Sequence, residues 1–255
     1  MGLIDTHCHL DVSAFDPDRK NVLARARANG VAGIVVPGVL AHDWDRLWRL
    51  CAGEPDLYPA LGMHPVYLDH HRDADLQQLE ALLTAHRPVA VGEIGLDYFI
   101  TDPDRTRQQA LFEAQLELAR AANLPVILHV RKAHDRVLST LKRIRVCGGT
   151  SHAFNGSRQQ AAQYIELGFK LGFGGMLTYP RSSKLRALAR ELPLEAIVLE
   201  TDAPDMTVAR HHGERNSPEY LPDCLVALAE VRGEEPEVIA RQTTANAREV
   251  LGLHA

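Results

Sequence analysis

The chain has 255 residues, of which 45% are hydrophobic, 24% charged and 5% aromatic, a composition that excludes disordered and collagen-like sequence. The formal net charge of −5 argues against a broad basic surface that would hold duplex nucleic acid nonspecifically, but it does not exclude a small phosphate-binding site. The 13 histidines are many for a chain with few aromatic residues, so their positions are the main question.

Short apolar runs alternate with longer segments of helical period, which predicts repeated βα units along the whole chain. The predicted strands, in chain order, are Leu3–Thr6, Gly33–Val36, Leu57–Leu61, Val89–Gly92, Val126–His129, Gly149–His152, Lys170–Gly172 and Ile197–Glu200. The clearest helical segment has apolar residues three and four apart from Leu111 to Ala119, ahead of a stop at Asn123 and Pro125.

This alternation matches an α/β fold of the (β/α)8 TIM-barrel type. Eight βα units in about 250 residues suit a barrel better than a doubly wound open sheet, which more often has fewer strands or an extra domain. The sequence contains no Pro/Gly/Ser-rich linker, charge block or long repeat. We therefore expect a single domain over residues 1–255.

The cysteines and the apolar runs indicate the expected environment. Cys8, Cys51, Cys147 and Cys224 form no C-x-x-C pair, and polar residues follow the N-terminus at once, unlike a signal peptide. A reduced, cytoplasmic protein is therefore expected. No apolar run approaches the roughly 18 residues that a membrane span needs. We expect no membrane contact and find no sign of an obligate protein partner.

Residues of metal-binding type close or follow several predicted strands. They are His7 and His9 after the first strand, Glu93 after the fourth, His129 at the end of the fifth, His152 at the end of the sixth and Asp202 after the eighth. The loops after the strand C-termini build the active site of a barrel, so these residues are predicted to share one rim. Each of them alone could equally be a hydrogen-bonded core residue or a helix cap. Their coincidence at strand ends favours a common site.

These residue types favour a two-metal site. His7 and His9 are two apart on an extended segment, which points both imidazoles to one side, although an H-x-H pair alone is a weak signal. Four imidazoles and two carboxylates are too many for one tetrahedral ion with an open position, but they fit two divalent cations that share a carboxylate. Glu93 is the candidate bridge. Imidazole ligands favour zinc, manganese or iron over magnesium. Magnesium stays an alternative, because the availability of each metal in the cell also decides which ion is bound.

Longer motifs surround these residues. They are Ile4-Asp5-Thr6-His7-Cys8-His9, Ala60-Leu61-Gly62-Met63-His64-Pro65, Val91-Gly92-Glu93-Ile94-Gly95-Leu96-Asp97, Leu124-Pro125-Val126-Ile127-Leu128-His129, Ser151-His152-Ala153-Phe154 and Leu199-Glu200-Thr201-Asp202-Ala203-Pro204. In this combination the chain resembles the TatD family of metal-dependent deoxyribonucleases, in the amidohydrolase-like barrel superfamily, and is most similar to its YjjV-like branch. The resemblance covers essentially the whole chain.

The resemblance implies a ligand set and an activity. The implied ligands are His7, His9, Glu93 and Asp202 for one metal, and Glu93, His129 and His152 for the other. Ala153 stands where the family usually has a cysteine that is not a ligand, so this departure leaves the metal site intact. The implied activity is hydrolysis of DNA, typically as a 3'-5' exonuclease. Asp202 would then be both ligand and proton acceptor, and its alternative role is a helix cap.

Four further residues are candidate substrate contacts, namely His64, Arg131, Tyr179 and Arg181. His64 is predicted at the rim, to touch a phosphate or leaving group or to stabilise its own turn. Arg131 suits a bidentate phosphate contact, with a salt bridge to Asp135 as the alternative. Tyr179 and Arg181 suit a base or a phosphate, or they fix their loop.

Other polar residues are given supporting roles. Asp97 and Glu200 are expected to accept the free ring N–H of a ligand histidine, with a plain salt bridge as the alternative. The histidines in helical or polar stretches are expected at the surface, namely His42, His70, His71, His86, His134 and His254.

Three functions remain open at this point. The first is a two-metal phosphodiesterase that acts on DNA ends, single-stranded or frayed, because an acidic chain should bind polynucleotide weakly outside its site. The second is a hydrolase of a small amide, ester or lactone on the same barrel and metals, and the fold alone cannot choose between them. Arg131 and Arg181 favour a phosphate substrate. The third is a catalytically silent metal-binding protein, against which the complete ligand set argues.

Overall fold

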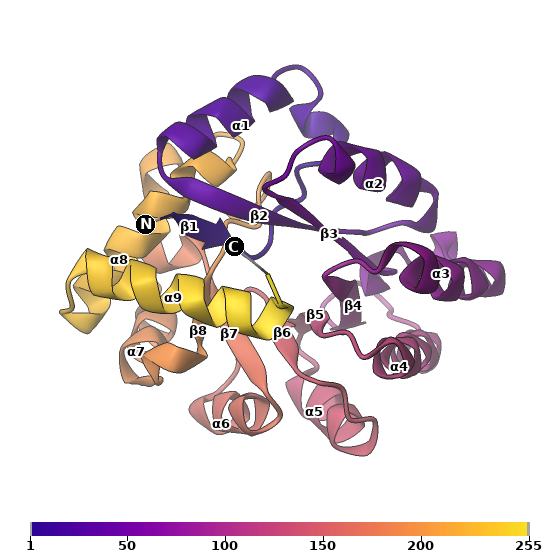
Figure 1. Cartoon of the computed structure of the whole chain (residues 1–255). Helices are drawn as coiled ribbons and strands as arrows, with labels where there is room; N and C mark the ends of the chain where they lie inside the picture. The colour runs from indigo at the N-terminus through magenta and orange to yellow at the C-terminus, as the bar shows by residue number, and fades with distance from the viewer. Residues whose placement is uncertain (1, 254–255) are drawn as a thin grey trace.

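Eight parallel strands form a sheet that curves into a nearly closed barrel (Figure 1). The structure is a computed structural model that describes residues 2–253. The strands are β1 (Leu3–Asp5), β2 (Val31–Pro37), β3 (Leu57–Leu61), β4 (Ala90–Asp97), β5 (Val126–Arg131), β6 (Gly149–Ser151), β7 (Phe169–Phe173) and β8 (Ile197–Leu199). Each strand pairs with the next one along the chain. The predicted (β/α)8 barrel is confirmed.

Helices lie outside the strands as an outer layer (Figure 1). They are α1 (Arg19–Ala28), α2 (Trp44–Ala52), α3 (Asp73–His86), α4 (Arg105–Ala122), α5 (His134–Arg143), α6 (Arg158–Glu166), α7 (Ser183–Glu191), α8 (Leu221–Arg232) and α9 (Pro236–Leu251). In α4 the buried Phe112, Leu116 and Ala119 line one face, as their spacing predicts. The helix ends at Asn123, whose left-handed backbone stops it. Among the described helices, none is long and apolar enough to cross a membrane.

Helix α9 closes the end of the barrel at which the strands begin (Figure 1). Asn246 on this helix donates two hydrogen bonds of 2.7 Å to the backbone oxygens of Leu194 and Ile197, at the start of β8. Apolar side chains of α9, of the segment just after it and of the strands fill this end, namely Ile4, Val35, Ala60, Ala90, Ile127, Val198, Ala247, Leu251 and Leu253. A functional site must therefore open at the opposite end, where the strands finish.

The first and last strands meet just beyond their ends. The backbone N–H of Thr6 donates to the oxygen of Leu199 at 3.0 Å, and the N–H of Asp202 donates to the oxygen of His7 at 2.8 Å. A third bond of 2.8 Å runs from the N–H of His9 to the oxygen of Ala203. The segments that close the barrel are therefore the ones that carry His7, His9 and Asp202.

Strand β4 extends further than the sequence predicts. The predicted strand ended at Gly92 with Glu93 after it, whereas β4 continues to Asp97 and Glu93 lies inside it. The register of β4 against β5 shifts between Val91 and Ile94, and a bulge of this kind re-aims the side chain that it contains. The glycine-rich sequence resembled a strand end, which is why the prediction stopped too early.

Gly95 permits β4 to continue beside β5. Its φ of 148° and its position are incompatible with a side chain, because a Cβ there would lie 2.0 Å from the backbone oxygen of His129. This glycine therefore serves a close approach of two backbones rather than a turn. Strand β5 likewise continues two residues past the predicted end, to Arg131, so His129 also lies within a strand.

Candidate metal centre

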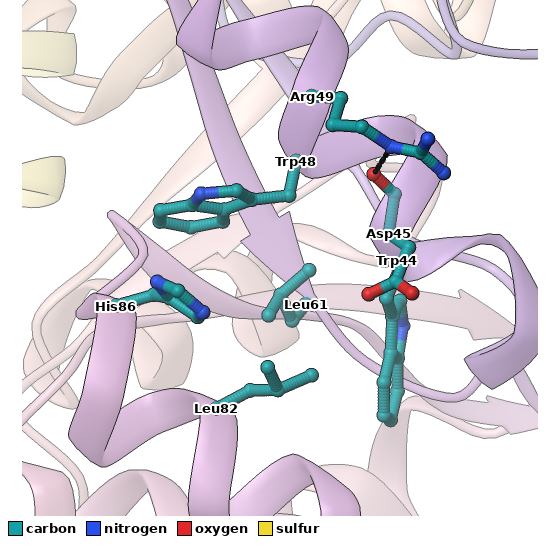
Figure 2. A pocket seen from close by; sticks show the side chains of 7 residues that line it. All are labelled: Trp44, Asp45, Trp48, Arg49, Leu61, Leu82 and His86. Carbon is teal, nitrogen blue, oxygen red and sulfur yellow. Dashed lines mark hydrogen bonds between the residues drawn. The ribbon is translucent and has the colours of Figure 1, made fainter.

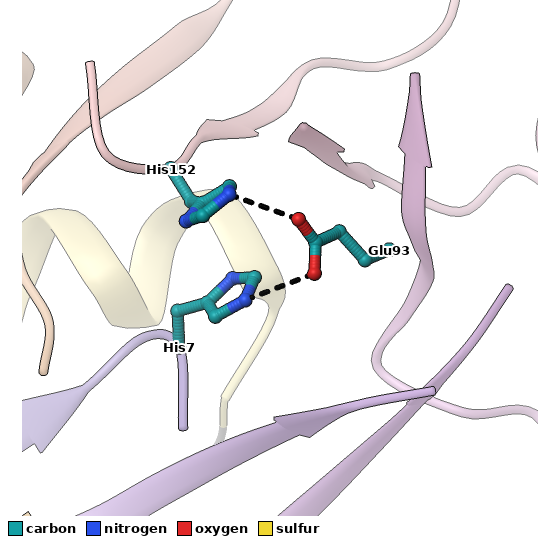
Figure 3. Close-up of side chains that lie close together, drawn as sticks. All are labelled: His7, Glu93 and His152. Carbon is teal, nitrogen blue, oxygen red and sulfur yellow. Dashed lines mark ion pairs between the residues drawn. The ribbon is translucent and has the colours of Figure 1, made fainter. Parts of the chain in front are cut away.

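The predicted ligand residues converge around one buried carboxylate at the C-terminal end of the barrel. Glu93 is only 1% exposed, and its two oxygens point toward different imidazoles, as Figure 3 shows for His7 and His152. The six residues predicted to bind metal, and brought together here, are His7, His9, Glu93, His129, His152 and Asp202.

One oxygen of Glu93, Oε2, faces the residues from the barrel closure. The Nε2 atoms of His7 and His9 lie 3.2 Å and 3.4 Å from it. Oδ1 of Asp202 completes this group at 3.6 Å and 3.7 Å from the same two nitrogens. Asp202 has a left-handed backbone with φ of 57°, which asparagine and aspartate tolerate better than most residues. We refer to His7, His9 and Asp202 as the first ligand group.

The other oxygen, Oε1, faces three imidazoles, one within β5 and two from the segments that directly follow β3 and β6. Nδ1 of His129 and Nε2 of His152 both lie 2.9 Å from it. Nε2 of His64 lies 3.3 Å away, and 3.1 Å from Nδ1 of His129. We refer to His64, His129 and His152 as the second ligand group. Glu93 thus joins two sets of potential ligands through its two oxygens.

The electrostatics of the cluster follow from a carboxylate surrounded by imidazoles. Burial alone would raise the pKa of Glu93, but the imidazoles of His152, His64 and His7 outweigh it and hold this pKa well below its usual range. Burial would lower the pKa of His152, yet the Glu93 carboxylate raises it to about 10. In contrast, burial and the neighbouring His152 lower the pKa of His7. Ligand imidazoles must be unprotonated, so metal binding competes with protons and strengthens as the pH rises.

The side chains present fit divalent metal ions. The possible ligand atoms lie within 4.8 Å of one another in three groupings, which are His7 with Glu93 and His152, His7 with His9 and Asp202, and His64 with Glu93 and His129. Oε2 of Glu93 is buried without a hydrogen-bond partner, although it points into the cluster. A buried, unpaired carboxylate oxygen is costly unless a cation satisfies it. Imidazole nitrogens with carboxylate oxygens are ligands that zinc and manganese accept.

Asp5 and Thr201 hold the first ligand group in place, a role that the sequence analysis missed. The buried Asp5 carboxylate accepts the Thr201 hydroxyl at 2.6 Å, the Thr201 N–H at 3.0 Å and the His7 N–H at 3.2 Å. Burial raises the pKa of Asp5 to about 7 against these hydrogen bonds. The signal was present in the sequence, because Asp5 and Thr201 lie beside ligands on strands that a closed barrel makes neighbours.

Asp97 orients a histidine of the second ligand group. Its Oδ2 lies 2.9 Å from Nε2 of His129, while Nδ1 of the same ring faces Glu93. This is the contact predicted for Asp97. Glu200 differs, because its Oε1 lies 3.9 Å from Nδ1 of His152, beyond hydrogen-bonding distance, and instead accepts the backbone N–H of Ala153. The hydrogen bond predicted for Glu200 is therefore not formed, and the 3.9 Å separation matches the salt-bridge alternative.

Replacing Asp97 with asparagine is expected to weaken metal binding at the second ligand group about 10- to 100-fold, because the His129 ring loses its carboxylate partner. Metal titration by isothermal calorimetry, with content measured after dialysis, tests this. Asp45→Asn on α2, outside the cluster, is the control. Unchanged affinity in Asp97→Asn would show that the contact does not support metal binding.

The four predicted substrate contacts have different surroundings. His64 was expected on the open rim, but it is buried at 8% exposure inside the second ligand group, because β3 delivers it beside His129. Arg131 lies at the rim with its side chain 48% exposed and contacts Asp97 rather than the alternative Asp135, with 3.9 Å between Nη1 and Oδ2. Arg131 is thus available to a substrate.

Tyr179 and Arg181 lie in a different part of the rim. The Tyr179 hydroxyl donates to the backbone oxygen of Thr207 at 3.1 Å, and the Arg181 guanidinium lies 5.6 Å from the centre of the Tyr179 ring. Within residues 2–253, no hydrogen bond or ion pair joins either side chain to the ligand groups. These contacts match the loop-fixing alternative for Tyr179, and a substrate role for the pair stays a prediction.

Two of the histidines expected at the surface are buried. His71 is 6% exposed and its Nε2 lies 2.9 Å from the backbone oxygen of His64, while His134 is 8% exposed between Tyr164 and Asn155. The surface prediction is wrong for both, because the loops after β3 and β6 fold over these rings. His254 lies outside the described residues.

A pocket of about 360 Å³ lies away from the metal centre, in the outer layer (Figure 2). Its lining comes from α2, β3 and α3 and comprises Trp44, Asp45, Trp48, Arg49, Leu61, Leu82 and His86. The Trp48 and His86 rings face one another with 4.6 Å between their centres. This pocket contains none of the predicted ligands, so it is separate from the candidate centre.

Comparison with known proteins identifies the family of the chain. A model of the family described as TatD related DNase matches residues 4–252. The chain belongs to the TatD family. It is 46% identical over 242 residues, 93% of each chain, to YjjV of Escherichia coli (strain K12), described as an uncharacterized metal-dependent hydrolase. It is 34% identical over 258 residues, 98% of each chain, to the 3'-5' ssDNA/RNA exonuclease TatD of Klebsiella pneumoniae (strain 342).

The fold of this TatD family member is also that of a solved relative. The crystal structure of the TatD homologue YjjV from Escherichia coli K12 superposes with a TM-score of 0.95 at 42% sequence identity, covering 99% of this chain and 98% of that one. The predicted family resemblance is therefore confirmed.

Proposed function

We propose that this TatD family protein is a metal-dependent hydrolase that cleaves phosphodiester bonds with two divalent cations held by the two ligand groups. The observation that carries the proposal is Glu93, whose Oε1 and Oε2 each face a separate group of imidazoles. A carboxylate placed in this way suits a shared ligand between two ions. The donors suit zinc or manganese best, with magnesium as an alternative.

The side chains of the centre would have separate roles in hydrolysis, some as metal ligands and one as a proton acceptor. Bound divalent cations activate a water molecule and neutralise the charge of a phosphodiester. His7, His9 and Asp202 would hold one ion and His129 and His152 the other, with Glu93 as a ligand of both. Burial raises the pKa of Asp202, which makes this carboxylate a stronger proton acceptor. Asp202 would take the water proton and deliver it to the leaving oxygen.

The substrate class follows from the charge at the rim and from the relatives. The exposed Arg131 at the end of β5 suits a phosphate, whereas a neutral amide, ester or lactone would gain little from it. The relative from Klebsiella pneumoniae is named a 3'-5' exonuclease of single-stranded DNA and RNA. We infer that this protein acts on single-stranded or frayed DNA ends in the 3'-5' direction. We also infer that residues 1–255 form one domain, since α9 closes the barrel that β1 begins.

A substrate comparison tests the proposed function. The protein is incubated at fixed salt with manganese, zinc or magnesium, with and without chelator. The substrates are single-stranded DNA labelled at either end, duplex DNA, RNA, bis(p-nitrophenyl) phosphate and a panel of small amides and lactones. We expect chelator-sensitive shortening of single-stranded DNA from the 3' end and little action on blunt duplex. Hydrolysis of an amide or lactone without DNA cleavage would overturn the proposal. Absence of any chelator-sensitive turnover would favour a silent metal-binding protein.

A further inference from the structure

An exposed aromatic ring with two cations lies at the rim beside the second ligand group. Phe99 follows β4 and is 53% exposed, which is unusual for so large an apolar side chain. The guanidinium carbon of Arg131 lies 4.2 Å from the centre of the Phe99 ring, and Nζ of Lys132 lies 4.9 Å from it. We call Phe99, Arg131 and Lys132 the Phe99 cluster.

The Phe99 cluster is tied to the metal centre through Asp97. Oδ1 of Asp97 accepts the backbone N–H of Phe99 at 2.8 Å, and Oδ2 contacts Nε2 of His129 at 2.9 Å and Arg131 at 3.9 Å. Arg131 also follows His129 by two residues on β5, which directs both side chains to the same side of the strand. One buried carboxylate therefore fixes the cluster relative to the ligand groups.

The backbone keeps Lys132 beside the ring. Lys132 has a left-handed conformation with φ of 52°, which turns the chain directly after β5. Such a conformation is uncommon for lysine and is maintained only where the surroundings specify it. The chain thus brings a second positive charge to an aromatic ring that is already covered in part by Arg131. Packing of the core does not require this arrangement, because Phe99 is largely exposed.

We propose that the Phe99 cluster is a nucleotide-binding subsite, in which one base of a single strand stacks on Phe99 while Arg131 and Lys132 hold the adjoining phosphate. The inference rests on the proposed function and names how its substrate is held. Aromatic rings bind unpaired bases of any sequence by stacking, and a guanidinium stacked on a ring keeps its N–H groups free for phosphate. A subsite of this kind gives an acidic protein local affinity for a strand end.

The kinetic test compares Phe99→Ala with Phe99→Trp, which keeps an aromatic face. For a single-stranded oligonucleotide, we expect Phe99→Ala to raise KM about tenfold with a smaller change in kcat, and Phe99→Trp to restore KM. The ratio of kcat/KM for the oligonucleotide to kcat/KM for bis(p-nitrophenyl) phosphate should fall about tenfold in Phe99→Ala. Val226→Ala, at an exposed valine on α8, is the control for loss of a surface apolar side chain.

A binding measurement provides a readout independent of turnover. A single strand that contains 2-aminopurine and slowly cleaved phosphorothioate linkages is titrated with the metal-loaded protein. Stacking on Phe99 should quench the fluorescence of 2-aminopurine, and Phe99→Ala should remove this quenching. Arg131→Gln should weaken binding of the strand and reduce the salt dependence of that binding, while the control Arg120→Gln should change neither. Unchanged KM and quenching in Phe99→Ala would overturn the subsite while DNA cleavage stood. Failure of the wild type to cleave DNA would instead overturn the proposed function.

Discussion

Replacing Glu93 with glutamine is expected to lower phosphodiester turnover at least about 10³-fold and to reduce the content of both metal ions. Both effects share one cause, because Oε2 faces the first ligand group and Oε1 faces the second. An amide nitrogen cannot replace a carboxylate oxygen as a ligand. When several residues act together in catalysis, removing one of them lowers the rate far more than the loss of a single contact would. Steady-state kinetics and metal content of the same preparation measure the two effects together.

The Glu93 result needs a folded variant to be interpretable. Removal of a buried negative charge from a cluster of imidazoles leaves the imidazoles without their counter-charge, so circular dichroism and thermal unfolding should accompany the kinetics. Glu117→Gln, at a half-buried glutamate of α4 outside the cluster, is the matched control. A folded Glu93→Gln protein that keeps both metals and more than a tenth of its activity would contradict the bridging role.

Asp202→Asn is expected to lower kcat about 10²- to 10⁴-fold and to change KM much less, since it removes a proton acceptor and one ligand of the first group rather than a contact to the substrate. Asparagine keeps the shape of the side chain and tolerates the left-handed backbone at this position. Metal bound by the second ligand group should persist, because Asp202 belongs to the first. This pattern separates Asp202 from Glu93, whose loss affects both groups.

The pH profile gives the Asp202 prediction a second readout. In the wild type, burial raises the pKa of Asp202, so activity should fall as this carboxylate becomes protonated on the acidic side. Asp202→Asn should lose that acidic limb while its residual rate stays low. Asp45→Asn on α2, outside the cluster, is the control. A variant with the wild-type acidic limb would assign the limb to another group.

The convergence of the ligand residues could be predicted from the sequence, because in a barrel the C-terminal ends of all the strands lie at one rim. His7 and Asp202 are far apart in the chain, yet parallel strands in chain order bring β1 beside β8 and their ends to one rim. Period and composition were sufficient to place the eight strands along the chain, but not the ends of β4 and β5. For Asp97 the sequence predicted only a contact to a ligand histidine; that this histidine is His129 follows from the observed register of β4 against β5, in which Gly95 pairs with His129 and Asp97 with Arg131.

Other features depended on details that no periodicity encodes. Glu93 points inward because of a bulge inside β4, and the sequence around it resembles a strand end. His64 was expected on the rim, but tertiary packing buries its ring against His129. His71 and His134 lie in polar stretches and are nevertheless covered by loops whose path is fixed by other elements. The errors for the three histidines share a cause, since burial after the strand ends is decided by loop packing.

The most direct test of the central claim measures metal content by mass spectrometry on the wild type and Glu93→Gln. Hydrolysis of a 3'-labelled single strand is measured on the same samples. The two-group arrangement predicts two divalent ions per wild-type chain, activity that is lost on chelation and restored by metal, and loss of both ions and activity in the variant. Full activity in thoroughly chelated wild type, or two ions retained by an active Glu93→Gln protein, would contradict a metal centre built on Glu93.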